Sequence, residues 1–562
     1  MMSINHKNNK PFIETPSTSH RWRFGDLPAS EWLPHLRRHL FTCDTKAHWQ
    51  LVWLNNNGNP VIGILPKTSW TVYLNLNNDK KGTATDYPSN PYKVIKNCRD
   101  KTTISTYMSH TDWQNELIAY SKAYEKTSNT VIKNQNPSTY HHGLIGFIGY
   151  DMTAHELSPS ANIPQAAQPC ALLGHYDIYL SPVEDNHQTL WQLTTPLSDV
   201  ANTTPYQAII SKLKRSLHSL DTELNSEQAK HKAQPATLIL KAQWHKSDYQ
   251  HAFAQTQRYL VQGDCYQINL TQAWQGYLHK PDDADPHNAH SAPTLLEYLP
   301  RLHANTQAPF AGYLENTDKN IDFELLSCSP ELFFTFIKET QTQQNYIRTK
   351  PIKGTMPRGT SVGQDAALKQ QLIDSEKDRS ENVMIVDLLR NDLGKYAKVG
   401  SVKVPQLFAI ESFSNVHHMV STITAELKAD THPLAVLFGS LPAGSITGTP
   451  KKRAVEIISE LEDAPRGAYC GTLGYMNFDG SGQWNVLIRT LQAGTDADNQ
   501  KHVSLWAGGG ITIASDCDAE YQECLDKVGN LLEVLAQNSV DIDFLPSLNG
   551  GEEVNENNSV RR

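Results

Sequence analysis

The chain has 562 residues, with 50 Lys and Arg against 59 Asp and Glu, so its formal net charge is −9. This acidic balance, without a basic stripe, excludes a general nucleic-acid binder, which needs cations to neutralise phosphates. No run reaches the roughly 18 apolar residues of a membrane-spanning helix, and the first residues form no apolar signal segment. We therefore expect a cytoplasmic protein with neither a membrane nor a nucleic acid as partner. At about 150 residues per domain, the length favours roughly three or four domains.

The eight cysteines are scattered along the chain, and no two of them form a C-x-x-C pair. Zinc sites and disulfide frameworks both require closely spaced or regularly paired cysteines. The sequence therefore predicts neither, and we expect most of these thiols to be small buried apolar groups.

Composition divides the chain into parts. Residues 1–20 and 541–562 are polar and hold little that a core could bury, so we predict a disordered leader and a disordered tail. The Lys- and Gln-rich stretch 221–236 reads as a boundary. It is predicted to separate an N-terminal part, 21–220, from a C-terminal part, 237–540.

Strands and helices alternate irregularly along both parts. Residues 48–73 alternate apolar runs with Asn and Gly turns, which predicts antiparallel strands, and the glycine-rich run 143–150 suits a strand that another backbone approaches closely. Next come a helix over 249–262, a strand over 265–273 and a hairpin over 323–337. Because this order is no regular βαβ repeat, it favours an α+β fold built on antiparallel sheets.

Lys353 is the first residue that could perform chemistry. It stands in the segment TKPIKGT, between a Pro-Ile pair and a glycine at the end of a predicted strand. A lysine held there and deprived of solvent could act as a nucleophile. The alternative is an ordinary surface lysine with a solvated head.

Two predicted helices carry rows of carboxylates. A helix from about 365 to 392 places Asp374, Asp378 and Glu381 on one face. A second helix over 518–535 repeats the pattern with Glu520, Glu523 and Lys527. Facing each other, they would offer oxygen ligands to Mg²⁺, which proteins usually hold by one or two carboxylates. Otherwise the two rows are simply solvated helix faces.

Glycine-rich segments give the third signal. The segments 444–451 and 507–511 contain consecutive backbone N–H groups that, in loops, can bind carboxylate or phosphate oxygens. The first segment does not match a P-loop, because Thr449 and Pro450 stand between its second glycine and the lysine. Nearby residues that could assist are Arg489, Tyr475 and the pair His417-His418. A buried structural histidine is the alternative reading of that pair.

In their order along the chain and in their amino-acid sequences, these segments resemble the chorismate-utilising enzymes, and most closely the aminodeoxychorismate synthases. The matching blocks span about 140 to 535 and read GLIGFIGYD, GDCYQINLTQ, SCSPELF, PIKGT, KDRSENVMIVDLLRNDLG, VHHMVSTI, GSITGTPK, CGTLGY, IRT, AGGGI and AEYQECLDK. The resemblance implies two intertwined lobes of antiparallel strands and helices, with chorismate and Mg²⁺ bound in a cleft between them. Before residue 140 the match is thin, and whether a tryptophan pocket exists there is open.

The resemblance also implies roles for residues at matching positions. Glu331 matches the general acid/base of the family. Glu381 and Glu523 match its Mg²⁺ ligands, with Asp378 and Glu520 beside them. The substrate-binding set implied by the motifs is Thr447, Tyr475, Arg489, Gly508, Gly509, Gly510, His418 and Lys527.

Two positions separate the related reactions within the family. Lys353 stands where aminodeoxychorismate synthases carry a lysine that attacks C2 of chorismate, whereas anthranilate synthases carry an alanine. Gln267 stands where the water-adding relatives carry a lysine as general base. The implied reaction is attack of Lys353 at C2 with loss of the C4 hydroxyl, followed by addition of ammonia at C4. The implied product is 4-amino-4-deoxychorismate, a precursor of 4-aminobenzoate and folate.

Ammonia implies a partner. No cysteine lies in a glycine-flanked segment of the glutaminase kind, so we expect a separate glutamine amidotransferase subunit as donor. Two alternatives remain open from the sequence: anthranilate synthase component I, and a non-catalytic chorismate-binding subunit. The latter would not need a lysine nucleophile.

Overall fold

The computed structural model describes fifteen stretches of the chain: 20–43, 49–75, 90–99, 103–128, 139–164, 166–185, 188–196, 204–226, 238–279, 293–318, 321–339, 341–413, 416–496, 498 and 500–536. Apart from His20, the predicted leader and tail lie outside these residues. None of the described helices combines the length and the apolar character needed to cross a membrane.

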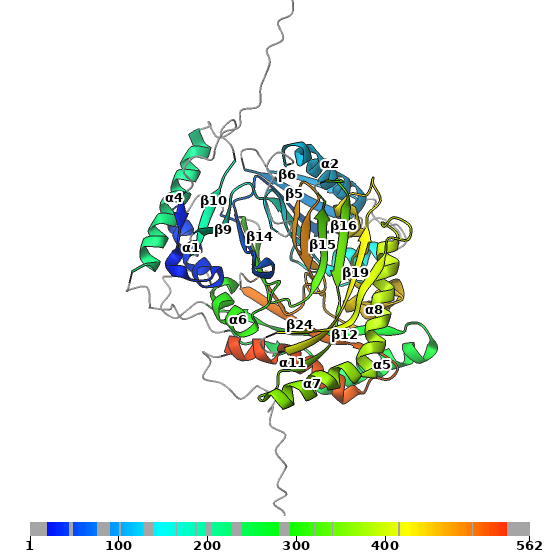
Figure 1. Ribbon diagram of the computed structural model, residues 1–562. Helices are drawn as coiled ribbons and strands as arrows, with labels where there is room; N and C mark the ends of the chain where they lie inside the picture. Colours follow the sequence, from blue (N-terminus) through cyan, green and yellow to red (C-terminus); the bar gives the residue numbers. More distant parts are fainter. Residues whose placement is uncertain are drawn as a thin grey trace, which may run out of the picture.

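The described strands form two antiparallel sheets, which we call sheet A and sheet B (Figure 1). In spatial order, sheet A contains β1 (Arg21–Trp22), β10 (Gln188–Thr194), β9 (Tyr179–Asp185), β3 (Val61–Ile64), β2 (Leu51–Leu54), β13 (Gly312–Asp318), β14 (Ile321–Ser327), β23 (Thr490–Thr495), β24 (Lys501–Ile511), β12 (Gln267–Leu278) and β11 (Lys241–Ala242), with β20 (Gly448–Thr449) paired to β12. Sheet B contains β17 (Ile352–Pro357), β19 (Val416–Glu426), β16 (Asn345–Lys350), β15 (Leu332–Lys338), β22 (Gly482–Asn485), β21 (Thr472–Asn477), β7 (Gly143–Ile148), β8 (Ala171–His175), β4 (Thr68–Leu74), β5 (Tyr92–Cys98) and β6 (Ile104–Met108), with β18 (Lys403–Ser412) paired to β19.

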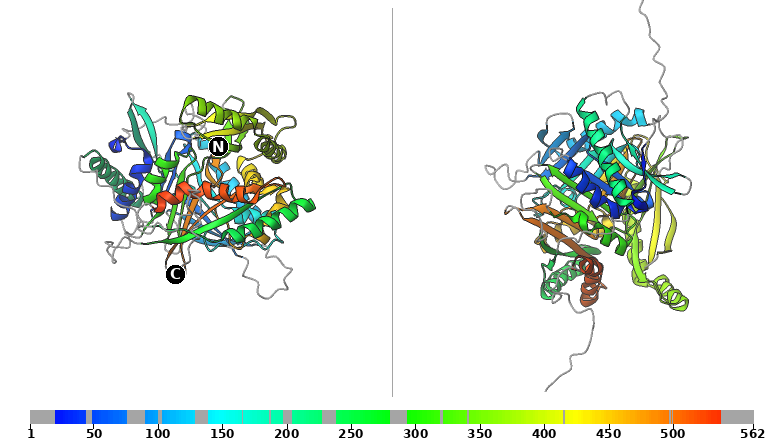
Figure 2. Two further views of the ribbon diagram at one scale, coloured as in Figure 1. Left: turned by 90° about the horizontal axis from the view of Figure 1, so that it is seen from below. Right: turned by 90° about the vertical axis from the view of Figure 1, so that its left-hand side faces the viewer.

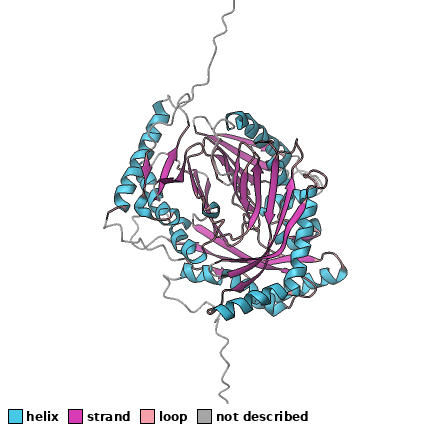
Figure 3. Cartoon of the chain, in the orientation of Figure 1, coloured by secondary structure: helices cyan, strands magenta, loops and turns pink. Residues whose placement is uncertain are grey.

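Helices cover the outside of the strands (Figure 3). They are α1 (Ala29–Cys43), α2 (His110–Ser128), α3 (Tyr150–Leu157), α4 (Thr204–Leu224), α5 (Lys246–Gln262), α6 (Leu299–Thr306), α7 (Val362–Asp374), α8 (Glu376–Gly394), α9 (Pro433–Ser440), α10 (Lys451–Leu461) and α11 (Cys517–Ala536). Helices α5 and α11 contact each other and pack against β12 and β24 (Figure 2). The predicted α+β class with antiparallel sheets is confirmed, as are the helices predicted over 249–262 and 518–535.

The two predicted parts of the chain are not separate domains. In sheet A, β13 pairs with β2, and in sheet B, β21 pairs with β7, so each sheet joins a strand from before residue 220 to one from after residue 237. The predicted division into 21–220 and 237–540 was wrong as a structural boundary, because backbone pairing links strands that are distant in sequence.

Two further local predictions were wrong. The expected hairpin over 323–337 is not one, because β14 lies in sheet A and β15 in sheet B; the chain crosses from sheet to sheet over 328–331. The expected single helix over 365–392 is two helices, α7 and α8. Ser375 separates them, because its extended backbone ends α7 while its hydroxyl accepts a hydrogen bond from the Asp378 N–H and caps α8.

The glycine segment 507–511 was predicted to be a loop but lies inside strand β24. Its residues pair with β12, with Thr271 opposite Gly508 and Asn269 opposite Gly510. On the other side, pairing with β23 ends at Leu505, so from Trp506 onward this side of β24 has no strand beside it among the described residues. The close backbone approach predicted for 143–150 is confirmed, since a Cβ on Gly146 would lie 1.9 Å from the Leu172 carbonyl oxygen.

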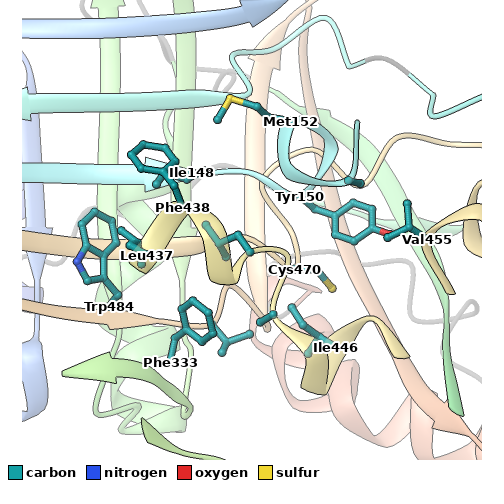
Figure 4. Packing of buried hydrophobic residues seen from close by; sticks show 14 of the residues in the cluster. Ile148, Tyr150, Met152, Phe333, Leu437, Phe438, Ile446, Val455, Cys470 and Trp484 are labelled. Carbon is teal, nitrogen blue, oxygen red and sulfur yellow. The ribbon is translucent and has the colours of Figure 1, made fainter. Parts of the chain in front are cut away.

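The largest apolar core packs helices α9 and α10 against sheet B and the inner end of sheet A. Figure 4 shows part of it, where Phe333 of β15 and Trp484 of β22 lie near Leu437 and Phe438 of α9. All four side chains are almost fully buried. Burial on this scale, at about 25 cal/mol per Å² of apolar surface, supplies most of the driving force for joining the elements.

A buried ion pair between Arg466 and Glu462 lies beside this core. Both nitrogens of the Arg466 guanidinium that face Glu462 donate to its carboxylate, at 2.7 and 2.6 Å, and Arg466 also donates to the carbonyl oxygens of Asn269 and Ile446. Glu462 in turn accepts from the N–H and the hydroxyl of Thr271. The network therefore ties the turn after α10 to β12 and to the segment around Ile446, with its charges fully paired.

Replacing Arg466 by Met should destabilise the protein strongly, because Glu462 would stay buried without a cation. We expect a loss of about 3 to 5 kcal/mol in the free energy of unfolding, measured by urea denaturation. The control is R21A, which removes the exposed Arg21–Asp185 ion pair and should cost less than about 1 kcal/mol. Equal losses in the two variants would contradict a structural role for the buried network.

Candidate active site

A cavity of about 490 Å³ lies where β24 and β12 of sheet A meet β17 and β19 of sheet B, flanked by α8 and α11. We call it the central cavity. Its volume is in the range of small-molecule sites. It is lined by Asn269, Pro330, Glu331, Ile352, Lys353, Gly354, Thr355, Lys377, Asp378, Glu381, His418, Ser445, Ile446, Tyr469, Ile488, Arg489, Trp506, Ala507, Gly508, Gly510, Glu520, Glu523, Asp526 and Lys527.

Glu331 reaches the cavity from the segment that crosses between the sheets. Its backbone carbonyl accepts from the Val486 N–H, and its carboxyl accepts a long hydrogen bond, 3.4 Å, from the Ser445 hydroxyl. Burial raises the pKa of Glu331 to about 7, although the Lys353 ammonium and the Ser445 bond act in the opposite direction. A carboxyl group with this pKa can give up and regain a proton near neutral pH, as a general acid or base must.

Lys353 lies near the start of β17, with its ammonium in the cavity. The Nζ atom is 3.1 Å from Oε2 of Glu381 on α8, and both side chains are largely buried. A Cβ on Gly510 would lie 3.3 Å from this Nζ and 2.4 Å from Nε2 of Gln267. The absence of a side chain at Gly510 therefore lets Lys353 and Gln267 approach the same point of the glycine strand. Gln267 has no basic group, so it cannot activate water.

Lysines face three of the four predicted metal ligands. Besides the Lys353–Glu381 pair, Lys377 lies 3.1 Å from Glu520 and Lys527 lies 2.8 Å from Glu523. Asp374, the other residue of the predicted row, is exposed and away from the cavity, because α7 ends there. The facing helices thus bring carboxylates from α8 and α11 to one cavity, and Glu381, Glu520 and Glu523 each lie beside a lysine.

The carboxylates are compatible with a divalent cation. The Oε1 atom of Glu381 is buried and has no hydrogen-bond partner among the described residues, a state that is costly unless a cation or donor binds. Within the described stretches, no group of three or more His, Cys, Asp or Glu side chains is arranged to hold a metal ion. Mg²⁺ commonly takes one or two carboxylates and completes its shell with water and substrate oxygens, so the donor set fits that cation.

Arg489 and His418 form the other polar wall. No side chain of the described residues forms an ion pair or hydrogen bond with the Arg489 guanidinium, and its backbone is held at a φ of 52°, which is rare outside glycine. The His418 ring shares a hydrogen bond of 2.8 Å with the Thr355 hydroxyl. Burial, together with the charge of Arg489, lowers the pKa of His418 to about 4. This wall therefore presents one cation beside a neutral imidazole, which suits an anionic ligand.

The remaining predicted residues are divided between the cavity and the interior. Gly508, Gly510 and Lys527 line the cavity, and the Lys527 ammonium donates to the Gly508 carbonyl at 2.8 Å. Gly509 lies against α11 instead, where a Cβ would come 2.9 Å from Glu520. Thr447 is buried behind the cavity and donates its hydroxyl to the Ala443 carbonyl.

Tyr475 is the clearest correction. It was predicted to bind substrate, but it lies in a separate apolar cluster with Ile145 and Leu473, away from the cavity lining. Tyr469, six positions earlier, lines the cavity and was missed. It lies in the turn that Arg466 holds in place, just before Cys470 at a φ of 65°. Without the position of that turn, the sequence alone could not show which of the two tyrosines, Tyr469 or Tyr475, lines the cavity.

Comparison with known proteins identifies the family. A family model described as chorismate binding enzyme matches residues 77–533. The chain belongs to this family. The matched residues lie on both sides of the boundary predicted at 221–236, and both sheets likewise contain strands from both sides of it.

Curated relatives show which members of the family this chain is similar to. Aminodeoxychorismate synthase component 1 of Klebsiella aerogenes is 42% identical over 304 residues, which cover 53% of this chain and 61% of that protein. Its counterpart of the same name in Salmonella typhimurium is 36% identical over 398 residues, covering 70% of this chain and 76% of that protein. The alignment thus spans less than two thirds of the first relative.

Among solved structures, anthranilate synthase component I of Streptococcus pneumoniae aligns with a TM-score of 0.63. The alignment covers 84% of this chain and 91% of that one, at 21% identity. At this identity the likeness shows that the two chains share a fold, which is the two-sheet α+β architecture described above.

The raised pKa of Glu331 predicts a specific pH dependence of stability. Its carboxyl holds a proton in the folded protein up to about pH 7 but loses it near its ordinary pKa when unfolded, so it lowers stability as pH rises through that interval. E331Q removes this effect. The unfolding temperature of E331Q relative to the unaltered protein should therefore rise between pH 5 and pH 8, as measured by calorimetry. A constant difference across this range would contradict the assignment.

Proposed function

We propose that the chain is component 1 of an aminodeoxychorismate synthase, which converts chorismate and ammonia to 4-amino-4-deoxychorismate. The observation that carries the proposal is the position of Lys353: a largely buried lysine in the cavity of a chorismate-binding enzyme, facing the glycine strand and the non-basic Gln267. The names of the relatives support the same activity.

Chorismate carries two carboxylates, and the cavity offers cationic positions for both. Arg489 supplies a guanidinium that has no side-chain partner among the described residues and lies beside His418, and Lys527 lies next to Gly508. Backbone groups on the open side of β24 can add hydrogen bonds, because no strand in the described part of the chain pairs with that side after Leu505. These residues would fix the ring between the nucleophile and Glu331.

The chemistry then follows from Lys353 and Glu331. As the Lys353 amine nitrogen forms a bond to C2, the two conjugated ring double bonds shift to C1=C6 and C4=C5 and the C4–O bond breaks, and Glu331 supplies a proton so that water leaves. Ammonia next forms a bond to C4 while the C2–N bond breaks and Lys353 leaves as the amine. The net reaction consumes chorismate and ammonia and releases aminodeoxychorismate and water. A carboxyl group with a pKa of about 7 suits the proton transfers.

Glu381 and Glu523, with Asp378 and Glu520 beside them, would hold Mg²⁺. When bound, the ion supplies Lewis-acid assistance and a template for the substrate carboxylate. The support from this chain is the unpartnered Oε1 of Glu381 and the convergence of α8 and α11 on one cavity. The lysine partners of these carboxylates would have to move aside or turn toward the substrate.

The ammonia donor would be a glutamine amidotransferase subunit. Two relatives are named as component 1, which implies a second component in those enzymes. The alternative, anthranilate synthase component I, is supported by the shared fold alone. The position of Lys353 favours the aminodeoxychorismate reaction, because that lysine has no task in a direct amination at C2.

Replacing Lys353 by Ala tests the activity. With chorismate, Mg²⁺ and ammonium, K353A should lose aminodeoxychorismate formation by more than about a thousandfold, since the nucleophile is gone. The matched control is K350A, because Lys350 pairs with Glu411 and does not line the cavity. Product is measured by liquid chromatography. Full activity of K353A, or anthranilate as the product of the unaltered protein, would contradict the proposal.

Replacing Glu381 by Gln tests the metal site. Calorimetric titration with Mg²⁺ in the presence of chorismate should show affinity at least about tenfold weaker in E381Q, because a carboxylate ligand is lost. The control E376Q removes an exposed carboxylate of the same helix that does not line the cavity. Unchanged Mg²⁺ affinity in E381Q would overturn the assignment of this ligand.

A further inference from the structure

Asp151 is a buried carboxyl group that the proposed chemistry does not use. It lies in the first turn of α3 and is 3% exposed. Its Oδ2 atom accepts a hydrogen bond of 2.9 Å from the N–H of Gly467, and the N–H of Tyr150 donates to the Gly467 carbonyl oxygen at the same distance. Two successive residues of α3 therefore bind both polar backbone groups of one glycine.

Gly467 begins the turn 467–470, which carries Tyr469 into the central cavity. Its φ of 63° lies in the left-handed region, which glycine adopts about as readily as the usual one, so the residue type alone does not fix this backbone orientation. The hydrogen bonds from α3 supply the restraint. Because a buried N–H without a partner is costly, loss of the Asp151 carboxyl would favour another orientation of this peptide group.

Sheet A holds the same turn from another side. The side-chain amide of Gln492 in β23 donates to the Arg466 carbonyl oxygen and accepts from the Ala468 N–H, both at 2.8 Å. The turn is thus joined to sheet A through Gln492 and to α3, which follows strand β7 of sheet B, through Asp151. Its position depends on both sheets.

The turn determines where the Tyr469 ring lies. Tyr469 is buried, and its ring stacks on Trp506 with centroids 6.1 Å apart and planes at 14°. Both residues line the central cavity, as do Arg489 and Gly508. A displaced turn would therefore change both the ring stack and the shape of the cavity that receives the substrate.

We propose that Asp151 is a positioning residue for chorismate binding, because by holding Gly467 it places Tyr469 in the central cavity. This inference rests on the proposed function, in which chorismate occupies that cavity. Asp151 is not among the residues that line the cavity, so its effect on the substrate passes through the turn.

This role does not require a charge on Asp151. Burial raises the pKa of its carboxyl group to about 8, although the Gly467 hydrogen bond and the Arg466 guanidinium act in the opposite direction. The group is therefore largely protonated at pH 7. Asparagine has the same shape and keeps an oxygen acceptor, so D151N should preserve the position of the turn, whereas D151A removes the acceptor.

The experiment measures the kinetics of D151A and D151N with chorismate, Mg²⁺ and saturating ammonium at pH 7. The chorismate KM should rise about tenfold or more in D151A, while kcat changes less than about threefold, because Tyr469 has no proton-transfer or nucleophilic task in the proposed reaction. D151N should stay within about twofold of the unaltered protein. The control D177A removes another buried carboxylate, which pairs with Arg99 and does not line the central cavity, and should leave the chorismate KM within about twofold.

A double-mutant cycle tests the path through Tyr469. In a Y469A background, D151A should raise the chorismate KM by less than about twofold further, because the side chain that Asp151 positions is already absent. A further tenfold rise in that background would show that Asp151 acts on binding by another path, and would overturn the proposal.

The remaining outcomes are equally decisive. An unchanged chorismate KM in D151A, or an equal rise in D151N, would overturn the positioning role while leaving the proposed function intact. Absence of aminodeoxychorismate from the unaltered protein would instead refute the proposed function. Should D151A not fold, D151S takes its place, since its side chain is shorter and polar; it should show the same rise, and an unchanged KM would again overturn the role.

Discussion

The constraint on which the cavity depends is that the chain crosses repeatedly between two sheets, each built from both halves of the sequence. Strand β13 pairs with β2 in sheet A, and β21 pairs with β7 in sheet B. The crossing at 328–331 carries Glu331 to the junction, where it faces Lys353 of β17. The residues that line the cavity lie between Asn269 and Lys527, in segments that are far apart along this half of the chain. The buried Arg466–Glu462 pair stabilises the wall that contains Tyr469.

Within that frame, the site combines three electrostatic environments. Lysines balance the carboxylates of α8 and α11, burial keeps Glu331 largely protonated below pH 7, and Arg489 stays without a partner in the described part of the chain. A dianionic substrate can therefore meet positive charge at one wall and a proton donor at another. The net charge of −9 does not reveal these positively charged positions, because it sums over the whole chain whereas the cations gather at the cavity.

The sequence correctly predicted features that follow from the spacing of nearby residues or from a long motif. Helical periodicity located the carboxylate row of α11, and the family motifs brought Glu331, Lys353, Glu381 and Arg489 to one cavity, as the structure also does. The predictions that failed concern strand pairing between residues distant in sequence. Nothing local shows that β14 and β15 belong to different sheets, or that the glycines after Trp506 continue a strand. Tyr469 escaped notice because only its turn, held by Arg466, places it in the cavity.

The most direct measurement of the central claim is the mass of the protein mixed with Mg²⁺ and chorismate in the absence of ammonia. If Lys353 attacks C2, peptide mass spectrometry after rapid acid quenching should find a covalent adduct on the peptide that contains Lys353, and ammonium added before the quench should remove it. An unmodified Lys353 under conditions in which the same preparation turns over chorismate with ammonium would contradict covalent catalysis by this residue.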